Sequence, residues 1–227
     1  MILGIDTSLG TAVAVVEQDG LVRAEASSPN PLGHAEVIGD LLEAVLADAA
    51  LGPVGSTAPA EPVVVSHVAV GMGPGPFTGL RVGIAAARAF ALGRGIPVVP
   101  VVSHDAIALA HLLDLALVGG VDEPVARFAV VTDARRREFA YTVYEGLDDD
   151  GLPVRATEPA LTPRDEIDDV LSAAGAARLD GSAVPAAMIA TVAGRALAAG
   201  RQAGPDEALY LRSPDVTLSA GPKRVTA

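Results

Sequence analysis

The stretch Gly71–Arg81, GMGPGPFTGLR, decides the fold of this chain. It follows an apolar run, His67 to Val70, and precedes a helical pattern, so we expect a turn that connects a strand to a helix. Its four glycines permit positive φ or close backbone approach, and its two prolines restrict φ. Thr78 is placed to cap the following helix. Such a loop is typical of a site that holds an anion or a partner.

The residue types of the loop favour a rigid positioning loop over a phosphate-binding loop. A Walker A loop ends in Gly-Lys-Ser/Thr, whereas Thr78–Leu80 reads Thr-Gly-Leu. The dinucleotide fingerprint G-x-G-x-x-G also fails, because a threonine follows Gly73 and Gly75 where the third glycine belongs. Pro74 and Pro76 lack the backbone N–H groups that a phosphate would need.

Composition narrows the class of protein. The 227 residues are 50% apolar and 3% aromatic without tryptophan, which suits a core of aliphatic side chains in sheets covered by helices and disfavours a base-stacking platform. The formal charge of −12 disfavours direct contact with a nucleic acid backbone. The absence of cysteine excludes a disulfide scaffold, a thiolate metal site and a cysteine nucleophile. Neither a signal peptide nor a membrane span is recognisable, so we expect a soluble cytoplasmic protein.

The periodicity predicts alternating strands and helices. Gly52-Pro53 should end the first, amphipathic helix, and a loop over 53–62 should follow it. A small-residue stripe on the second helix, Gly79, Gly83, Ala87 and Ala91, would let another backbone approach closely. In the first half we expect strands at 2–5, 12–16, 21–26, 64–70 and 96–102, and helices at 34–51, 79–92 and 103–117.

The second half repeats the start of the first. Residues 128–133 and 139–144 again read as strand, short turn and strand, and Asp133 takes the place of Asp6. An acidic hairpin turn (146–151), a helix at 184–199 and a polar tail ending in Lys223-Arg224 follow. We therefore predict an α/β protein of two lobes, residues 1–104 and a degenerate copy, 105–227. Its pattern resembles the ribonuclease-H-like lobes of actin and sugar kinases (ASKHA type), with mixed sheets flanked by helices.

Four motifs carry a closer resemblance over essentially the whole chain. They are Asp6-Thr7-Ser8, the loop Gly73–Gly83, Asp133-Ala134-Arg135 and Tyr210-Leu211-Arg212, in that order. Together they resemble the bacterial TsaB (YeaZ) family. The loop of that family usually reads G-P-G-S-F-T-G-L-R, so Pro76 replaces a serine and removes one donor and one hydroxyl.

The resemblance implies a non-catalytic subunit of the machinery that makes threonylcarbamoyladenosine (t6A) in tRNA. Its partners would be a TsaD-like transferase and a TsaE-like ATPase, with a homodimer when alone and tRNA reached only through the complex. Metal-binding H-x-x-x-H motifs occur in TsaD-like subunits, but no two of the four histidines here are four residues apart. No cofactor is firmly implied, although the resemblance allows ATP or ADP with Mg²⁺ at the complex interface.

Asp6 and Asp133 each permit two interpretations. Actin-like ATPases hold Mg²⁺ through a carboxylate at this position, whereas an Asp in such a turn also accepts hydrogen bonds from its own backbone. The turn interpretation is favoured for Asp6, because no further carboxylate accompanies it in the motif. Arg135–Arg137 fit a solvated turn best, with a nucleic acid or an acidic neighbour as the alternative. The candidate nucleotide-binding residues are Asp6, Thr7, Ser8, Gly73 and Gly75.

The helices at 34–51 and 79–92 are the predicted partner surface. The first has apolar residues on more than one side, and in the TsaB family these two helices meet TsaD or a second TsaB. Arg81, at a helix start, opposes the helix dipole and would be free to reach a carboxylate or a partner. The predicted interface residues are Val37, Leu41, Val45, Gly79, Arg81, Gly83 and Ala87. The rival hypothesis is an independent ATP-dependent small-molecule kinase or ATPase of the same fold.

Overall fold

The computed structural model describes residues 1–30, 33–51, 62–119 and 125–211. Most of the predicted loop over 53–62 lies outside these residues, and so does Lys223-Arg224 in the predicted tail. None of the helices in the described ranges is both long and apolar enough to cross a membrane.

The first sheet has five strands in the order β3-β2-β1-β4-β5. β1 pairs antiparallel with β2 and parallel with β4, so an N-terminal meander is extended by two parallel strands. The predicted strands are confirmed, with ends shifted by up to three residues. Their bounds are β1 Ile2–Asp6, β2 Thr11–Val16, β3 Val22–Ser28, β4 His67–Gly71 and β5 Val98–Val101.

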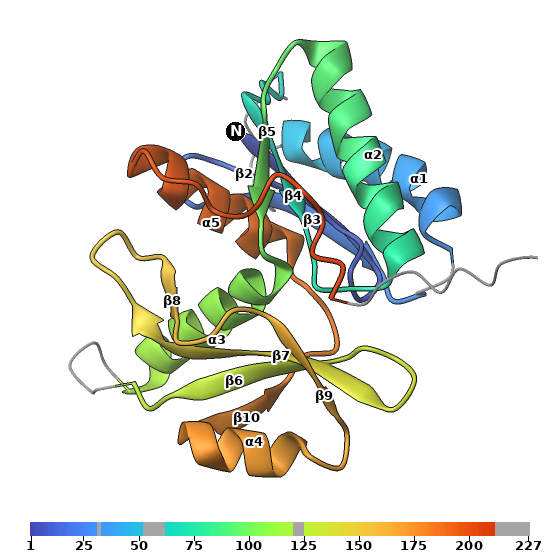
Figure 1. The fold of residues 1–227 in the computed structure, drawn as a ribbon. Coiled ribbons are helices and arrows are strands. Elements are labelled where there is room, and N and C mark those ends of the chain that lie inside the picture. The colour runs from blue at the N-terminus through green and yellow to red at the C-terminus, as the bar shows by residue number, and fades with distance from the viewer. Residues whose placement is uncertain (31–32, 52–61, 120–124, 212–227) are drawn as a thin grey trace, which may run out of the picture.

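Helices cover both faces of this sheet (Figure 1). α1 (His34–Leu51) and α2 (Phe77–Arg94) lie on one face, and α5 (Ala186–Ala198) lies on the other. The alternation of β-strand side chains supplies both cores, because Leu3 packs toward α1 and α2 while Ile2 packs toward α5. α5 approaches β1 closely at Gly4, where a Cβ would lie 2.2 Å from a backbone oxygen of the helix.

The second sheet repeats the beginning of the first. β6 pairs antiparallel with β7 and parallel with β10, and both β8 and β9 pair with β7. Along its main path the order is β10-β6-β7-β8, so within the described residues the sheet ends at β10 where the first continues to β5. The strands are β6 Phe128–Asp133, β7 Glu138–Leu147, β8 Pro153–Arg155, β9 Ala160–Pro163 and β10 Ala177–Asp180.

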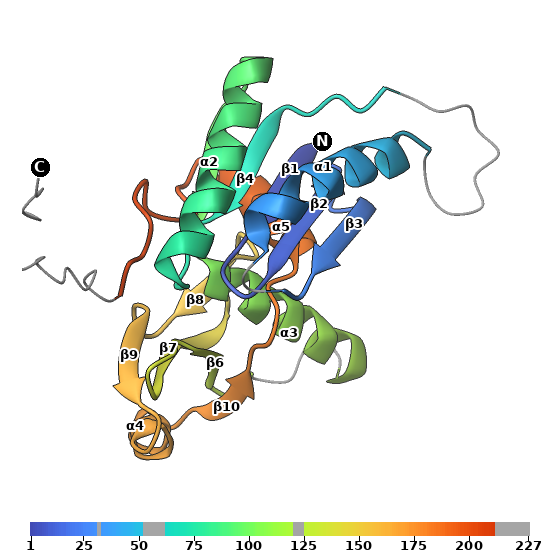
Figure 2. The same cartoon turned by 90° about the vertical axis from the view of Figure 1, so that its right-hand side faces the viewer.

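Two helices cross between the lobes. α3 (Ser103–Gly119) follows a strand of the first sheet but packs on the second, whose other face α4 (Ile167–Ala174) covers. α5 follows a strand of the second sheet but packs on the first (Figure 2). A division at 104/105 therefore separates α5 from the sheet that it covers. One continuous core of buried residues joins α3, α5 and both sheets.

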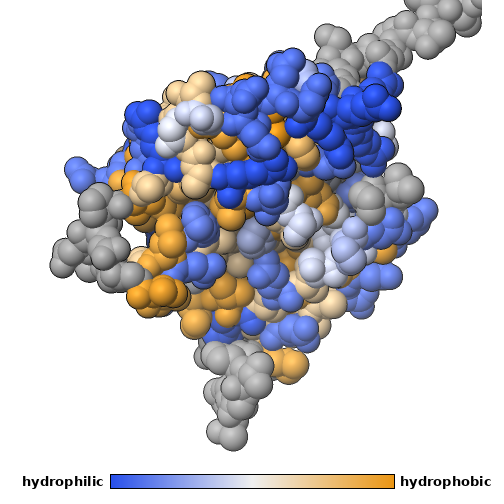
Figure 3. Space-filling model, turned by 90° about the horizontal axis from the view of Figure 1, so that it is seen from below, coloured by the Kyte–Doolittle hydropathy of each residue, from blue (hydrophilic) through white to orange (hydrophobic). Residues whose placement is uncertain are grey.

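The helix predictions are confirmed for α1, whose bounds match, and within three residues at either end for α2, α3 and α5. Thr78 is not the cap of α2, because Pro76 is the N-cap residue and the helix begins at Phe77. The sequence interpretation missed β8, β9, α4 and β10. Seen from below, the surface is mixed, with hydrophobic residues gathered mainly toward the left of the view (Figure 3). The most exposed apolar side chains of α3, Leu117 and Val118, lie at its C-terminal end.

Candidate functional site

The glycine loop is held between two segments distant in sequence. At the start of α3, the Ser103 N–H donates to the Gly73 carbonyl (2.8 Å) and the Ser103 hydroxyl accepts from the Gly73 N–H (3.1 Å). On the other side, the Leu209 N–H donates to the Met72 carbonyl (2.7 Å). The Gly73–Pro74 peptide is cis, and Gly73 has a φ of 97°, which glycine adopts without strain. These contacts fix the loop as a rigid corner.

Asp6 lies at the centre of this corner. Its carboxylate accepts hydrogen bonds from the Ser8 N–H (2.7 Å), the Ser103 hydroxyl (2.6 Å) and the Ser8 hydroxyl (3.2 Å). The side chain is 1% exposed. Burial raises the pKa of Asp6 to about 6, against the lowering effect of the hydrogen bonds from Ser103 and Ser8. The predicted turn hydrogen bond is thus present, and Ser103 is a further partner that the sequence did not indicate.

The residues proposed to bind a nucleotide come together, but they fill the space between themselves. A Cβ on Gly71 would lie 1.8 Å from the Asp6 carboxylate, and one on Gly75 would lie 2.9 Å from the Ser8 Cα. The Thr7 hydroxyl donates to the Gly79 carbonyl (2.7 Å). Asp6, Thr7, Ser8 and Gly73 are all buried, and Gly75 is half-buried. This close packing supports the structural interpretation of Asp6 over the ligand interpretation.

The small-residue stripe of α2 also packs within the chain. A Cβ on Gly79 would lie 2.7 Å from the Thr7 carbonyl, and one on Gly83 would lie 2.3 Å from the Thr7 hydroxyl. Ala87 is buried as well, and so is Val45 of α1. The stripe therefore lets α2 approach the turn that follows β1 in its own chain. Of the other residues predicted to meet a partner, Val37 and Leu41 are half-buried and Arg81 is exposed.

The corresponding turn of the second lobe is open. Asp133 accepts a hydrogen bond from the Arg135 N–H (2.7 Å), as predicted. It also forms an ion pair with Arg164 (2.6 Å). Burial acts to raise the pKa of Asp133, but the Arg135 N–H and Arg164 outweigh it, and the pKa is lowered. Arg135, Arg136 and Arg137 are exposed and have left-handed φ values of 63°, 49° and 64°. Such values are uncommon for residues with side chains.

A buried polar network joins α3 to the second sheet. The two ring nitrogens of His104 lie 2.8 Å from the Thr142 hydroxyl and 2.9 Å from the Thr132 hydroxyl. Burial lowers the pKa of His104 to about 3, with a further contribution from the positive charge of Arg155, so this histidine is neutral. The sequence interpretation assigned its histidines to the surface or to local hydrogen bonds, and it gave no signal for these two threonine partners.

Asp105, the next residue, is the second part of this network. Arg155 binds its carboxylate through Nε (2.8 Å) and Nη2 (2.5 Å), and the Tyr144 hydroxyl donates to it (2.8 Å). Burial raises the pKa of Asp105, while these three hydrogen bonds act to lower it. In the described ranges, no three His, Asp or Glu side chains are grouped in a way that could hold a metal ion. The network anchors the start of α3 to the second sheet.

Two of the family-like motifs meet at the surface. Arg81, from the glycine loop motif, has its Cζ 3.7 Å from the centre of the Phe77 ring, and its Nε donates to the Tyr210 hydroxyl (3.4 Å). The Phe77 and Tyr210 rings are 4.7 Å apart. All three side chains are exposed. We call Phe77, Arg81 and Tyr210 the aromatic–arginine cluster.

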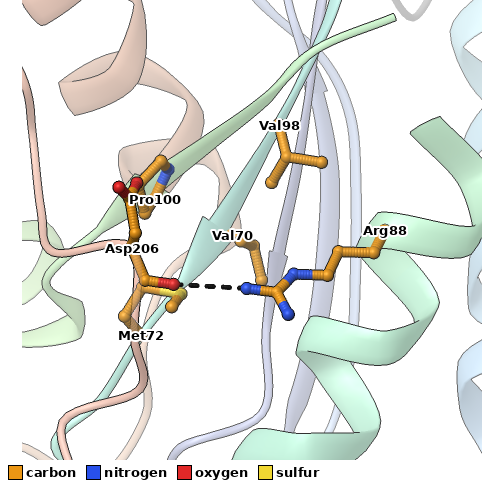
Figure 4. A pocket seen from close by; sticks show the side chains of 6 residues that line it. All are labelled: Val70, Met72, Arg88, Val98, Pro100 and Asp206. Atoms are coloured by element: carbon orange, nitrogen blue, oxygen red, sulfur yellow. Dashed lines mark hydrogen bonds between the residues drawn. The ribbon is translucent and has the colours of Figure 1, made fainter. Parts of the chain in front are cut away.

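A pocket of about 230 Å³ lies between α2 and the edge strand β5 (Figure 4). Val70, Met72, Val98 and Pro100 form its apolar lining, and Arg88 and Asp206 stand on either side of it. The Arg88 side chain donates to the Asp206 carbonyl (3.2 Å). The segment before Tyr210 thereby closes over the edge of the first sheet.

The two sheets and the crossing helices place the protein in the class of ASKHA-like α/β folds. Two structures from Pseudomonas aeruginosa share this fold at 24% identity. One is an uncharacterized protein with similarity to peptidase YEAZ. Its alignment has a TM-score of 0.66 and covers 93% of this chain and 99% of that protein's chain. The other is YeaZ, whose alignment has a TM-score of 0.65 and covers 92% of this chain and 99% of the YeaZ chain.

Sequence comparison then identifies the family. The sequence model of the family described as TsaD, tRNA N6-adenosine threonylcarbamoyltransferase, matches residues 29–161, more than half of the chain. An uncharacterized protein of Mycobacterium tuberculosis is 38% identical over 179 residues, 77% of this chain and 72% of that protein. The tRNA threonylcarbamoyladenosine biosynthesis protein TsaB of Escherichia coli is 28% identical over 163 residues, 71% of this chain and 62% of that one. The chain belongs to the TsaB/YeaZ family.

Proposed function

We propose that this protein is a non-catalytic subunit of a t6A synthesis complex and that it binds and organises a TsaD-type transferase. The similarity to TsaB proteins supports a role in t6A biosynthesis. The observation that carries the partner role is the outer helix face of α1 and α2. This face consists of the exposed residues Glu36, Asp40, Glu43, Ala44 and Ala47 of α1 and Arg81, Ala85, Arg88 and Ala89 of α2.

Opposite charges on the two helices support a docking role for this face. α1 contains Glu36, Asp40, Glu43 and Asp48 but no basic residue, whereas α2 contains Arg81, Arg88 and Arg94 but no acidic residue. The helices are neighbours, yet within the described residues no ion pair joins them. Arg94 lies in the last turn, where its charge suits the helix dipole. Arg81 and Arg88 donate hydrogen bonds within the chain, to the Tyr210 hydroxyl and the Asp206 carbonyl. Like the acidic residues of α1, however, they have no ion pair among the described residues, so these charges can pair with a partner of complementary pattern.

The size of the exposed side chains also favours helix-to-helix docking. Ala85 and Ala89 are one turn apart on the outward side of α2, so a partner helix could come close there. This pair replaces the buried stripe of Gly79, Gly83 and Ala87 as the small-residue contact. Val37 and Leu41 lie half-buried on α1 and would contribute apolar area beside it. A second copy could use the same face when the transferase is absent.

A reconstituted modification reaction tests the proposal. Transferase, a TsaE-type ATPase, a threonylcarbamoyl-adenylate synthase and tRNA from one organism are combined with and without this chain, and t6A is measured by mass spectrometry. We expect t6A only with the chain. Ala89→Glu should lose t6A formation, because the added carboxylate blocks the outer helix face. Ala116→Glu, at an exposed helical alanine of α3, is the matched control and should retain it. Equal t6A without the chain would contradict the proposal.

The rival function is ATP turnover by the isolated chain. Asp6 follows the first strand, as in ATPases of this fold class, and this position is what motivates the hypothesis. The hydrogen bonds of Asp6 to Ser8 and Ser103 weigh against it. Mg²⁺-dependent hydrolysis by the isolated protein, lost in Asp6→Ala, would favour the rival. If the isolated protein neither binds nor hydrolyses ATP, the rival hypothesis is wrong.

A further inference from the structure

The aromatic–arginine cluster is built for contact rather than for the core. The chain has four phenylalanines and three tyrosines. All seven lie in the described ranges, and the two most exposed rings are Phe77 (37%) and Tyr210 (38%). They lie 133 positions apart in sequence, yet their rings are in contact with each other next to Arg81. Exposed aromatic rings around an arginine are typical of the residues that dominate binding energy at protein interfaces.

Arg81 itself is poorly placed to stabilise this chain. It lies in the N-terminal part of α2, where a positive charge opposes the helix dipole. Among the described residues no carboxylate lies within ion-pair distance of it, although the chain carries a formal charge of −12. Its only hydrogen bond there is from Nε to the Tyr210 hydroxyl. The Nη donors on the outer edge of the guanidinium therefore have no protein acceptor in this part of the chain.

The rings hold the guanidinium ready for a ligand. Phe77 lies 3.7 Å from Cζ on one side, and the Tyr210 hydroxyl fixes the direction of Nε. A guanidinium held in this way loses little freedom on binding, and its fork of N–H donors matches the two oxygens of a carboxylate. Tyr210 is in turn anchored through Leu209, which donates to Met72 of the glycine loop. The loop and the segment that ends the described chain thus jointly position one arginine.

We propose that Arg81 is the anchor for an Asp or Glu side chain of the protein partner that docks on the outer helix face. This inference rests on the proposed function, because Arg81 belongs to that face and lies one turn from Ala85. A carboxylate on the guanidinium, at the edge of the paired Phe77 and Tyr210 rings, would be partly shielded from water, which strengthens its pairing with Arg81. The acidic charge of the chain favours a protein carboxylate over RNA phosphate as the occupant.

Isothermal titration of this protein with the TsaD-type transferase of the same organism tests the anchor. Arg81→Met keeps a stem over Phe77 and removes the guanidinium, so we expect its affinity to fall about thirtyfold. Arg81→Lys keeps the charge but loses the planar fork, and it should lie in between. Arg94→Met is the matched control, because Arg94 is also exposed, lies 5.3 Å over the Phe90 ring and has no ion pair among the described residues. Its affinity should stay within about threefold of the wild type.

The outcomes separate the anchor from the proposed function. If the wild type binds and Arg81→Met binds within threefold of it, the anchor is wrong and the partner role stands. If the wild type does not bind, both are wrong. Titration of each variant with a tRNA transcript is the second arm. A loss of tRNA affinity in Arg81→Met, with transferase affinity unchanged, would overturn the carboxylate assignment in favour of RNA phosphate. Unfolding curves of the isolated variants check that each is folded.

Discussion

The Asp6 turn and the Asp133 turn begin the two lobes in the same way and end in different environments. Each Asp ends the first strand of its sheet and accepts a 2.7 Å hydrogen bond from the backbone N–H two residues on. Asp6 is 1% exposed and bonds to Ser103, whereas the Asp133 side chain is 60% exposed and pairs with Arg164. The same local turn therefore serves once as a buried junction and once as open surface.

The loops that follow β4 and β10, the parallel neighbours of β1 and β6, extend the comparison. β4 leads into α2 and β10 leads into α5, and both helices start after an N-cap proline, Pro76 with φ −61° and Pro185 with φ −69°. The first loop carries glycines packed against Asp6 and Ser8, whereas the second reads Gly-Ser-Ala-Val-Pro. The repeat thus preserves backbone geometry, while tight packing around the acidic turn occurs in the first lobe.

The largest effect is expected at the buried ion pair that anchors α3 to the second sheet. Arg155→Met leaves the carboxylate of Asp105 buried without its cation, and we expect the free energy of unfolding to fall by about 3–5 kcal/mol. Arg164→Met breaks the exposed pair with Asp133 and should cost less than about 1 kcal/mol. Urea denaturation at pH 7 measures both. Equal losses of unfolding free energy in the two variants would contradict the distinction between the buried and the exposed ion pair.

A glycine pair tests the packing at the ends of the two parallel strands. Gly71→Ala would place a Cβ 1.8 Å from the Asp6 carboxylate and must displace the network, which we expect to cost about 3 kcal/mol. Gly181→Ala, after β10, would meet the mobile end of Ile107 at 2.9 Å and should cost about 1 kcal/mol. Thermal or urea unfolding compares the two. A tolerated Gly71→Ala would show that the corner has room for a ligand.

The pH dependence of Asp6 sharpens the comparison further. Its pKa rises from 3.8 to about 6 on folding, so its contribution to stability is fully present below pH 3.8 and is lost as the pH rises through about 6. Between pH 4.5 and 7.5 the stability of the wild type relative to Asp6→Asn should fall by about 2 kcal/mol. Urea titrations of both proteins across this range measure the difference, and a pH-independent difference would contradict the buried carboxylate.

Asp133 should show the opposite sign and the smallest effect. Its pKa is lowered on folding, so its contribution is present above pH 3.8 and is lost as the pH falls through the folded value. Because the side chain is exposed, Asp133→Asn should change the free energy of unfolding by less than about 1 kcal/mol at pH 7. Denaturation curves at pH 7 and pH 4 test it. A larger loss at pH 7 would mean that the second turn is also structural.

The elements that the sequence predicted are those with strong local patterns. α1 has a regular apolar period and β1 and β2 are short aliphatic runs, so their bounds agree with the structure closely. The sequence does not predict α4, which is short and carries Asp168 and Asp169 in its first turn, nor β10 (ARLD), which has four residues and no β-branched or aromatic side chain. The residue type of Thr78 predicts a helix cap, but Pro76, whose φ is fixed by its ring, is the N-cap residue of α2.

The candidate site was predictable in its local parts only. The turn hydrogen bonds of Asp6 and Asp133 follow from residue type, and Arg81 was identified from its conflict with the helix dipole. The contact of Asp6 with Ser103, 97 positions away, depends on tertiary structure, and so does that of Arg81 with Tyr210. The burial of Gly79 and Gly83 was not readable either, because a small-residue stripe serves internal and external packing equally well.

The most direct test of the partner role is the molar mass of an equimolar mixture with the TsaD-type transferase. Light scattering after size-exclusion chromatography at micromolar concentration should give one peak with the mass of a complex containing both chains. The same experiment with Ala89→Glu should give the masses of the separate proteins, and Ala116→Glu should behave as the wild type. Two separate peaks for the wild-type mixture would contradict the account.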